Sequence, residues 1–554
     1  MMGVLKAAMT TATLWVAATG GYGQMQPGTA PPAPAIVPKY GVFEVVLTFD
    51  DKVANPFADA RASAVFTSPA GKRVEVEGFH DGGNRWKVRF APRLEGRWKY
   101  TSAIRTLKGK PGKTPGPAGE FVCKGSAGRG FLRPSERNPY RLQHEDGTPF
   151  YPVGIQTCGY FQVGFDGPEA GGGRRWRTVP AEQWCKAFEG AVNLIRWQLG
   201  AGTTAGCALS LIAKDAAAID RYDLELAAKM DALMRLQRTH GFRHIMILFQ
   251  DMSLWGNGAT AFGSGRDLKQ YKSLRAKNLP QQEQMLRYVV ARWGCWVDIW
   301  ELFNEDSYAP SDYLAHLAKV VREADPYDHP VTTNYARPRE PWCEIVTWHE
   351  YMGMPPSQVD SYITKVLAGL KSHGKVVLNT EFGNQGKLSN HDPVKWRIAV
   401  WTAFMNESSL LFWGMSGRKL PTGRKGVRGN ANAYIGPESR RYFRVLNEFT
   451  GGLPIDMRPV RSGYTAHDRI RTYALSNGKT TVLYVHHFAD HTKPYKHPGG
   501  LFVTTGPGRF RATWIDPADG RRIRTDEITC EQDQLTVNLP PVTIDAACRI
   551  DRQD

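Results

Sequence analysis

Residues 300–306 read WELFNED, an apolar run that ends in Asn304, Glu305 and Asp306. The segment that contains it, VDIWELFN (297–304), is typical of a buried β-strand. A carboxylate is costly to bury unless it is paired or hydrogen-bonded, so strand packing does not explain two adjacent acids at a strand end. A catalytic site would explain them.

The 297–304 segment is the fourth of eight short apolar runs that alternate with amphipathic segments. Five of the intervening segments (224–241, 281–294, 311–325, 359–374 and 394–407) carry apolar residues at helical spacing, and several end at glycine. Eight strands with intervening helices over about 300 residues predict a (β/α)8 TIM barrel, which we place at 131–450. The predicted strands are 150–156, 193–199, 244–250, 297–304, 330–335, 344–350, 375–382 and 409–415.

In the regions on both sides of the predicted barrel, apolar and polar residues alternate with a period of two. Short alternating runs with Gly and Pro turns predict an N-terminal β-sandwich over 37–125, and two hairpins turning at Gly478 and Gly520 predict a C-terminal one over 451–554. The Pro-rich stretch 24–36 is expected to be a stiff linker. We therefore predict a multidomain chain with a β-sandwich at each end of the barrel.

The first 23 residues place Lys6 before an apolar run and small residues, a pattern typical of a secretory signal peptide. We expect a secreted or periplasmic protein without membrane insertion, the alternative being a cytosolic N-terminus. The eight cysteines lack CxxC spacing, which does not indicate a zinc ribbon or a dense disulfide framework. Cys530 and Cys548 could pair in an oxidising compartment, or remain free thiols in a core.

Active sites of TIM barrels lie at the C-terminal ends of the strands. Acidic residues there are therefore catalytic candidates, whereas acidic residues on outer helices are mostly solvated. Glu305 follows the fourth strand and Glu381 ends the seventh, in VVLNTEF. Two carboxylates that face each other are what glycoside hydrolysis requires, one as proton donor and the other as nucleophile or base. The dipeptide Asn-Glu alone is weak support, because it recurs at 406–407 and 447–448 within helix-like runs.

WELFNE after the fourth strand, together with TEF at the seventh, resembles the large clan of retaining β-glycoside hydrolases on (β/α)8 barrels. The resemblance implies that Glu305 is the acid/base, that Glu381 is the nucleophile and that Asn304 binds the sugar 2-hydroxyl. It further implies that Arg196 keeps the nucleophile ionised, and that His349, Tyr351 and Trp413 are substrate-site residues that orient the nucleophile and stack against a sugar ring. The clan often has a histidine on strand three or five, where this chain has Gln250–Asp251 and Asn334–Tyr335.

The flanking regions have resemblances of their own. The runs NPF, FTSPAG, GFHDGG, WKVRFAP and EGRWKY resemble an immunoglobulin-like domain of unknown function found ahead of polysaccharide hydrolases. The C-terminal sandwich resembles collagen-binding-like modules. The alternative function is therefore a non-catalytic glycan- or matrix-binding protein that uses the barrel as a scaffold.

Several residues have structural interpretations beside the functional ones. Glu301 lies deeper in its strand than Glu305 and is expected to be a structural carboxylate, and Asp306 is expected to cap the next segment. Arg196 could only neutralise a core carboxylate, and Trp413 could be core. The cluster His486, His487, Asp490 and His491 does not predict a metal site, because adjacent strand residues point to opposite faces. We expect neither a metal nor another cofactor.

The net charge of +18 favours an acidic partner, and export makes nucleic acid a poor candidate. Two basic segments, 171–177 and 416–429, follow the first and eighth strands, which are neighbours in a closed barrel. Trp176, Arg174 and Arg175 belong to the first segment and are predicted to bind substrate. The sequence thus favours a polysaccharide or oligosaccharide substrate that carries sulfate or uronate groups, the alternative being that these are merely solvated loops. It does not indicate an oligomeric state.

Overall fold

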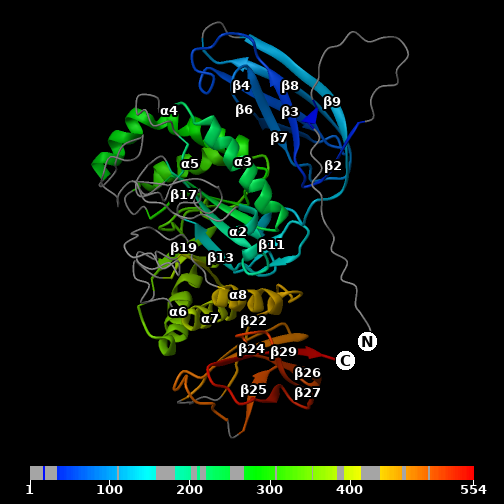
Figure 1. The fold of residues 1–554 in the computed structure, drawn as a ribbon, viewed down its shortest axis with the longest axis vertical. Coiled ribbons are helices and arrows are strands. Elements are labelled where there is room, and N and C mark those ends of the chain that lie inside the picture. The colour runs from blue at the N-terminus through cyan, green and yellow to red at the C-terminus, as the bar shows by residue number, and fades with distance from the viewer. Residues whose placement is uncertain are drawn as a thin grey trace.

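The computed structural model describes residues 17–18, 34–108, 112–157, 181–200, 209–211, 220–249, 268–305, 309–351, 353–383, 392–413, 437–463, 469–496 and 499–554. Three parts follow one another along the long axis of the molecule: an N-terminal sandwich, a central barrel and a C-terminal sandwich (Figure 1). The predicted fold class is therefore confirmed. The exact boundaries between the domains stay predictions.

The barrel contains eight parallel strands that are hydrogen-bonded in the order β18-β17-β16-β14-β13-β21-β20-β19. Counted along the chain this order is 5-4-3-2-1-8-7-6, so the first strand pairs with the eighth, and only the ladder between β18 and β19 is missing. All residues of β16, β17 and β20 are buried, as expected for parallel strands covered on both faces. The strands are β13 (Gly154–Thr157), β14 (Leu194–Gly200), β16 (Arg243–Phe249), β17 (Ile299–Phe303), β18 (Val331–Thr332), β19 (Ile345–Glu350), β20 (Val376–Phe382) and β21 (Ser409–Phe412).

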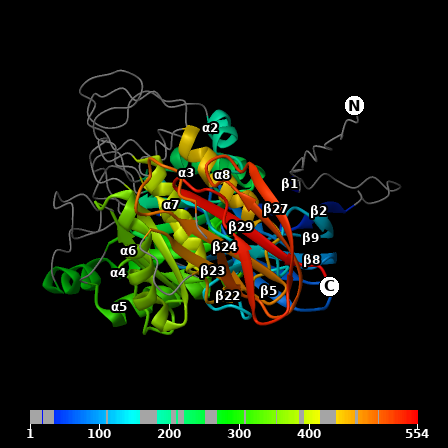
Figure 2. The ribbon, with the colours of Figure 1, turned by 90° about the horizontal axis from the view of Figure 1, so that it is seen from below.

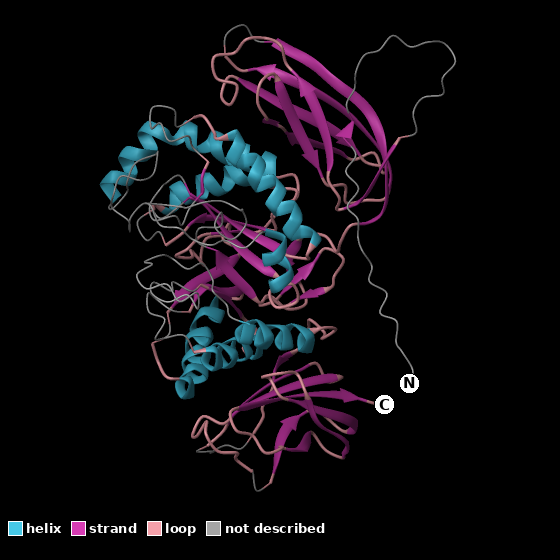
Figure 3. Ribbon diagram, viewed as in Figure 1, coloured by secondary structure: helices cyan, strands magenta, loops and turns pink. Residues whose placement is uncertain are grey.

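Helices surround the strands and separate them from the C-terminal sandwich (Figure 3). Asp223 and Asp392 cap α3 and α7 by accepting hydrogen bonds from backbone N–H groups. No helix lies in the described residues 333–344, between β18 and β19. The helices are α2 (Ala181–Phe188), α3 (Leu224–Thr239), α4 (Leu268–Trp293), α5 (Ser311–Ala324), α6 (Pro356–Leu370), the 3-10 helix η3 (Lys371–His373), α7 (Pro393–Met405) and α8 (Pro437–Thr450).

A small antiparallel sheet closes the N-terminal end of the barrel. Leu132, Leu142 and Phe150 of this sheet pack with apolar residues near the starts of the barrel strands. An active site can therefore lie only at the other end of the barrel, where the strands have their C-terminal ends. The sheet consists of β10 (Leu132–Pro134), β11 (Leu142–His144) and β12 (Pro149–Phe150), and β15 (Leu209–Ser210) pairs separately with β14.

The N-terminal sandwich packs two sheets around an aromatic core. Phe43 stacks on Phe121 and Phe66 stacks on Phe90, with ring centroids 4.3 and 4.2 Å apart. One sheet has the order β1-β3-β7-β6 and the other β2-β9-β8-β4-β5. Their strands are β1 (Ala17–Ala18), β2 (Ala35–Lys39), β3 (Phe43–Thr48), β4 (Ala60–Thr67), β5 (Arg73–Glu77), β6 (Phe79–His80), β7 (Arg85–Phe90), β8 (Gly96–Thr106) and β9 (Gly112–Ser126).

The C-terminal sandwich contains both predicted hairpins. Gly478 and Gly520 have φ of 83° and 75° at the two turns, a conformation that favours glycine. A six-stranded sheet, β22-β23-β24-β29-β26-β27, faces the pair β25-β28. The strands are β22 (Arg458–Pro459), β23 (Arg471–Ser476), β24 (Thr480–His486), β25 (Gly500–Thr504), β26 (Gly508–Ile515), β27 (Arg522–Cys530), β28 (Gln534–Asn538) and β29 (Asp545–Arg552).

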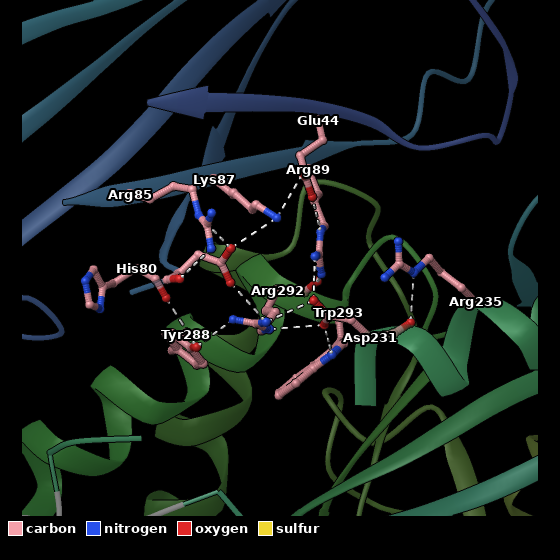
Figure 4. Close-up of polar contacts among 11 residues, drawn as sticks. Glu44, His80, Arg85, Lys87, Arg89, Asp231, Arg235, Tyr288, Arg292 and Trp293 are labelled. Atoms are coloured by element: carbon pink, nitrogen blue, oxygen red, sulfur yellow. Dashed lines mark hydrogen bonds and ion pairs between the residues drawn. The ribbon is translucent and has the colours of Figure 1, made fainter. Parts of the chain in front are cut away.

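The barrel and the N-terminal sandwich meet at a buried charge network (Figure 4). Asp231 of α3 accepts hydrogen bonds from Arg89 of β7 at 2.6 Å and from Arg292 of α4 at 2.9 Å. Arg89 also donates to Glu44 of β3, at 2.9 Å, and Arg292 lies 3.2 Å from Asp81. The sandwich and the barrel therefore share a set of neutralised charges.

The C-terminal sandwich and the barrel share an apolar core. Figure 2 shows this sandwich lying over α7 and α8. Every residue of α7 from Lys395 to Met405 is buried, because α7 lies between barrel strands and the sandwich. Trp401 of α7 stacks on Tyr484 of β24, with ring centroids 5.5 Å apart.

Six cysteines lie in the part of the chain that the structure describes, and all six are buried free thiols. Cys530 and Cys548 are among them, so the disulfide that we considered between them is not formed. Burial raises the pKa of the Cys548 thiol well above its ordinary value, which keeps this thiol protonated. Cys158 and Cys207 lie outside the described residues. Among the described helices, none has the length and apolar character of a membrane span.

Candidate active site

The predicted acids lie together at the C-terminal ends of the barrel strands. Glu305 follows β17, and Glu381 is next to last in β20. His349, near the end of β19, contacts both: its Nδ1 is 2.6 Å from Glu305 Oε1 and 3.5 Å from Glu381 Oε2. The two carboxylates, 76 residues apart in sequence, thus share one imidazole.

The backbone conformation at Glu305 is unusual. Its φ is 47°, in the left-handed region that residues other than glycine seldom occupy. Such conformations concentrate at functional sites, where the surrounding structure holds them in place. Here the chain turns directly after β17, and the turn directs the Glu305 side chain towards His349 rather than along the strand.

Arg196 of β14 connects four acidic or amide side chains and is completely buried. Its guanidinium donates to Glu381 at 2.7 Å, to Asn304 at 2.8 Å and to both oxygens of Glu301 at 2.7 and 2.5 Å. Arg196 therefore pairs with a core carboxylate, Glu301, and also contacts the predicted nucleophile, Glu381; its role in keeping Glu381 ionised stays a prediction. The paired contact with Glu301 fixes the plane of the guanidinium.

Tyr351 and Trp413 form one wall beside Glu381. The Tyr351 hydroxyl donates a hydrogen bond to Glu381 Oε2, and its ring centroid lies 5.7 Å from that of Trp413. Trp413 is half-buried, and its indole N–H has no hydrogen-bond partner among the described residues. Gln156 of β13, which the sequence interpretation did not single out, accepts from Arg196 while its amide nitrogen also lacks a partner there.

The two carboxyl groups differ in proton affinity. Burial raises the pKa of the Glu381 carboxyl, and this effect exceeds the opposing effects of His349 and Arg196. Burial also raises the pKa of Glu305, but the hydrogen bond and charge of His349 outweigh it, so the net pKa lies below its ordinary value. Because two close carboxylates resist joint ionisation, they titrate as a coupled pair.

Glu305, His349 and Glu381 also form the one group among the described residues whose donor atoms lie close enough for a metal ion, all within 4.8 Å of one another. These donors are already engaged with one another, and the remaining ring nitrogen of His349 lies 3.1 Å from the Thr380 hydroxyl. A carboxylate pair with a histidine can serve acid–base chemistry without a metal. The chelator test described below distinguishes the two uses.

The histidines of 485–491 are split between two environments. His486 lies 2.8 Å from Asp360 of α6 and 2.9 Å from His491, while His487 contacts the carbonyl oxygen of Thr543. Adjacent histidines therefore point in opposite directions, as the strand pattern predicts.

Other predicted residues lie outside the described part of the chain. These are Asp306, Gln250 and Asp251, and the basic segments 171–177 and 416–429, with Trp176, Arg174 and Arg175. Sequence reasoning also missed Gln156 and Thr380, which contact Arg196 and His349. Their position near the ends of β13 and β20 was the available signal.

Comparisons with known proteins agree with the architecture. Residues 36–105 match a family model described as a domain of unknown function, DUF5060, and no curated protein sequence matches the chain. A crystal structure of "a putative glycoside hydrolase" from Bacteroides vulgatus is similar at a TM-score of 0.66 and 18% identity, covering 94% of this chain and 100% of that one. A family 5 glycoside hydrolase from the same species is similar at 0.53 and 13% identity, covering 77% and 93%. These likenesses show a multidomain TIM-barrel fold shared with glycoside hydrolases.

Proposed function

We propose that this chain is a glycoside hydrolase in which Glu305 and Glu381 are the catalytic carboxylates. The observation that carries the proposal is their meeting: two acids from the fourth and seventh strands contact one histidine at the C-terminal end of a TIM barrel. Active sites of this fold lie at that end. The unpartnered N–H groups of Trp413 and Gln156 supply donors that suit sugar hydroxyls.

Glu381 is assigned as the nucleophile and Glu305 as the acid/base. Arg196 and Tyr351 both donate to Glu381, and donors aimed at a carboxylate favour its charged form. The Glu305 side chain is 16% exposed, against 1% for Glu381, so Glu305 can exchange its proton with water. In the structure the Glu381 pKa is raised and the Glu305 pKa is lowered, which is opposite to these roles. A bound glycan would remove water from Glu305 and so raise its pKa.

The closeness of the carboxylates supports a retaining mechanism. One oxygen of each belongs to the group of atoms that lie within 4.8 Å of one another, and this upper limit is below the roughly 6.5–9.5 Å between the carboxyl groups of inverting enzymes. In the first step Glu381 attacks the anomeric carbon, the glycosidic C–O bond breaks, and Glu305 gives its proton to the departing oxygen. In the second, Glu305 takes a proton from water, whose oxygen displaces Glu381.

The substrate is proposed to be a β-linked polysaccharide that carries sulfate or uronate groups. The support is the net charge of +18 together with the basic segments 171–177 and 416–429. An anionic substrate would be cleaved more slowly at high salt, because salt screens exposed charges. Equal rates on charged and neutral polymers at all salt concentrations would reject this part of the proposal.

Export is proposed as well, and the N-terminal sequence of the mature protein would test it.

The decisive experiment measures reducing ends released from algal, plant and animal polysaccharides. Glu381→Gln and Glu305→Gln are each expected to lower the rate by orders of magnitude while leaving the thermal transition near that of the parent. Glu448→Gln is the matched control, because Glu448 is the exposed acid of another Asn-Glu dipeptide, on α8. Near-normal activity of either site variant would overturn the assignment.

Further measurements separate a retaining mechanism, a metal-dependent mechanism and a non-catalytic role. Trapping with a 2-fluoro sugar should label Glu381, and proton NMR should show retained anomeric configuration; a label on Glu305 would exchange the roles. Activity that survives a chelator argues for acid–base chemistry, whereas activity lost to a chelator and restored by a divalent ion argues for a metal at the same three residues. Binding to glycans without any released ends would favour the non-catalytic alternative.

A further inference from the structure

A second site candidate lies at the opposite end of the barrel from Glu305 and Glu381. A pocket of about 520 Å³ is enclosed by the turn after β2, the connection 126–130 and the end of α3 with the start of β16. Arg243, which lines it, is the first residue of β16 and therefore lies at the closed, N-terminal end of the barrel. Residues of the N-terminal sandwich and of the barrel thus form its walls together.

The lining of this pocket is basic. Among the described residues that line it are four arginines and no aspartate or glutamate; the arginines are Arg129, Arg235, Arg238 and Arg243. Asp298, which is fully buried, pairs with two of them, at 2.8 Å from Arg238 and 3.4 Å from Arg243. Its single carboxylate therefore meets two guanidinium groups.

Three of the four arginines, Arg235, Arg238 and Arg243, are held in place before any ligand arrives. Arg243 is 9% exposed and donates to the carbonyl oxygen of Gly130 at 2.9 Å. Arg235 donates to the carbonyl oxygen of Asp231 at 3.1 Å, at the edge of the charge network (Figure 4). Burial and the neighbouring Arg238 lower the pKa of Arg243 to about 10, as crowding of positive charge would. Pre-positioned guanidinium groups lose little freedom when they bind an oxyanion.

The walls are suited to more than a bare ion. Tyr40, Phe242 and Trp296 line the pocket with aromatic rings, of which Tyr40 is half-buried and the other two are 1% and 5% exposed. The volume lies within the range of about 300–1,000 Å³ that small-molecule sites occupy. Guanidinium forks match the oxygen spacing of sulfate and phosphate. We propose that this pocket binds a sulfate or phosphate ester of a sugar, with the ester group held by the arginines and the sugar against the aromatic side chains.

The test is calorimetric titration of the full chain with glucose 6-phosphate, glucose 6-sulfate, inorganic phosphate and uncharged glucose. We expect both esters to bind, more weakly as salt is raised, and glucose not to bind. The affinities of the two esters show whether the pocket prefers phosphate or sulfate. Failure of both esters to bind would overturn the proposal, and inorganic phosphate binding as tightly as the esters would overturn its sugar part.

Gly128 offers a variant that should leave folding intact. A Cβ there would lie 3.8 Å from Arg243 Nη2, an ordinary contact. Gly128→Glu puts a carboxylate among the arginines and should weaken ester binding at least tenfold, while the matched Gly128→Gln keeps it. Equal binding by the two variants, with unchanged thermal transitions, would contradict the assignment.

A smaller effect is expected from Arg129→Gln, which removes one exposed lining charge and should weaken binding several-fold. Arg522→Gln, on an exposed strand of the C-terminal sandwich, is its control. Loss of affinity in both variants alike would show a general charge effect and overturn the site. None of these measurements uses glycan cleavage, so the proposed hydrolase activity can fail without affecting them.

Discussion

The two sandwiches are attached to the barrel by different kinds of polar contact. On the N-terminal side the most deeply buried charges form one connected network in which Asp231 accepts from two guanidinium groups and from the indole N–H of Trp293 (Figure 4), and Arg287–Glu77 is a separate, less buried pair. On the C-terminal side the charges form separate clusters, among them Arg397 with Asp545 and Asp360 with Arg471. In the network one carboxylate, Asp231, contacts both guanidinium groups, whereas each C-terminal cluster has a carboxylate of its own.

The largest effect is therefore expected from Asp231→Asn. It would leave Arg89 and Arg292 buried with less negative charge, and breaking a buried pair costs about 3–5 kcal/mol. Denaturant unfolding measures the loss. The exposed pair Arg511–Glu527 provides the control, since Arg511→Gln should change stability by less than about 1 kcal/mol. Equal losses in the two variants would mean that burial of the network has no energetic importance.

A smaller loss is expected from Asp545→Asn. Asp545 accepts two hydrogen bonds from Arg397, at 3.0 and 2.8 Å, and one from Tyr484 at 3.0 Å, so that one guanidinium rather than two loses its partner. We expect a loss of roughly 1.5–3 kcal/mol, typical of hydrogen bonds to charged groups. Replacing both partners, as in Arg397→Met with Asp545→Leu, should recover much of it. A loss larger than that of Asp231→Asn would reverse the comparison.

The difference between parent and Asp231→Asn should also depend on pH. Burial raises the pKa of Asp231, but Arg89 and Arg292 outweigh this effect and bring the pKa below its ordinary 3.8. A carboxylate with a lowered folded-state pKa stabilises the protein above its unfolded pKa and loses that contribution as pH falls through the folded value. The stability difference should thus be constant near neutral pH and shrink below about pH 4. A difference that shrinks between pH 8 and 6 would exclude Asp231 as its origin.

The barrel could be predicted because its signals are local. Each of the eight runs carries its own apolar pattern, and the order of strands then follows from the fold. The same logic located Glu305 and Glu381, because a strand end fixes where a side chain lies. Helix α2 was missed among the expected helical segments, and α8 was recognised only as a helix-like run around 447–448. No helix was expected between the fifth and sixth strands, where the structure has none.

The contacts that could not be predicted join residues with no sequence relationship. Arg89 and Asp231 are 142 residues apart, and neither lies in a motif. Glu301 looked structural because of its depth in the strand, yet it determines how Arg196 meets Glu381. Such roles depend on which side chains tertiary packing brings within hydrogen-bond distance, and a strand pattern does not contain that information.

Helix α7 has a consequence for how this chain can evolve. Leu475, Val482, Tyr484 and Ala547 of the C-terminal sandwich belong to the same apolar core as the barrel. Recombination near residue 451 would expose to water the apolar side chains of α7 that face the sandwich, such as Trp401, and would leave Arg397 without Asp545. The C-terminal sandwich is thus not an interchangeable module: barrel and sandwich should be inherited as one block, and a different partner domain would need a matching apolar face.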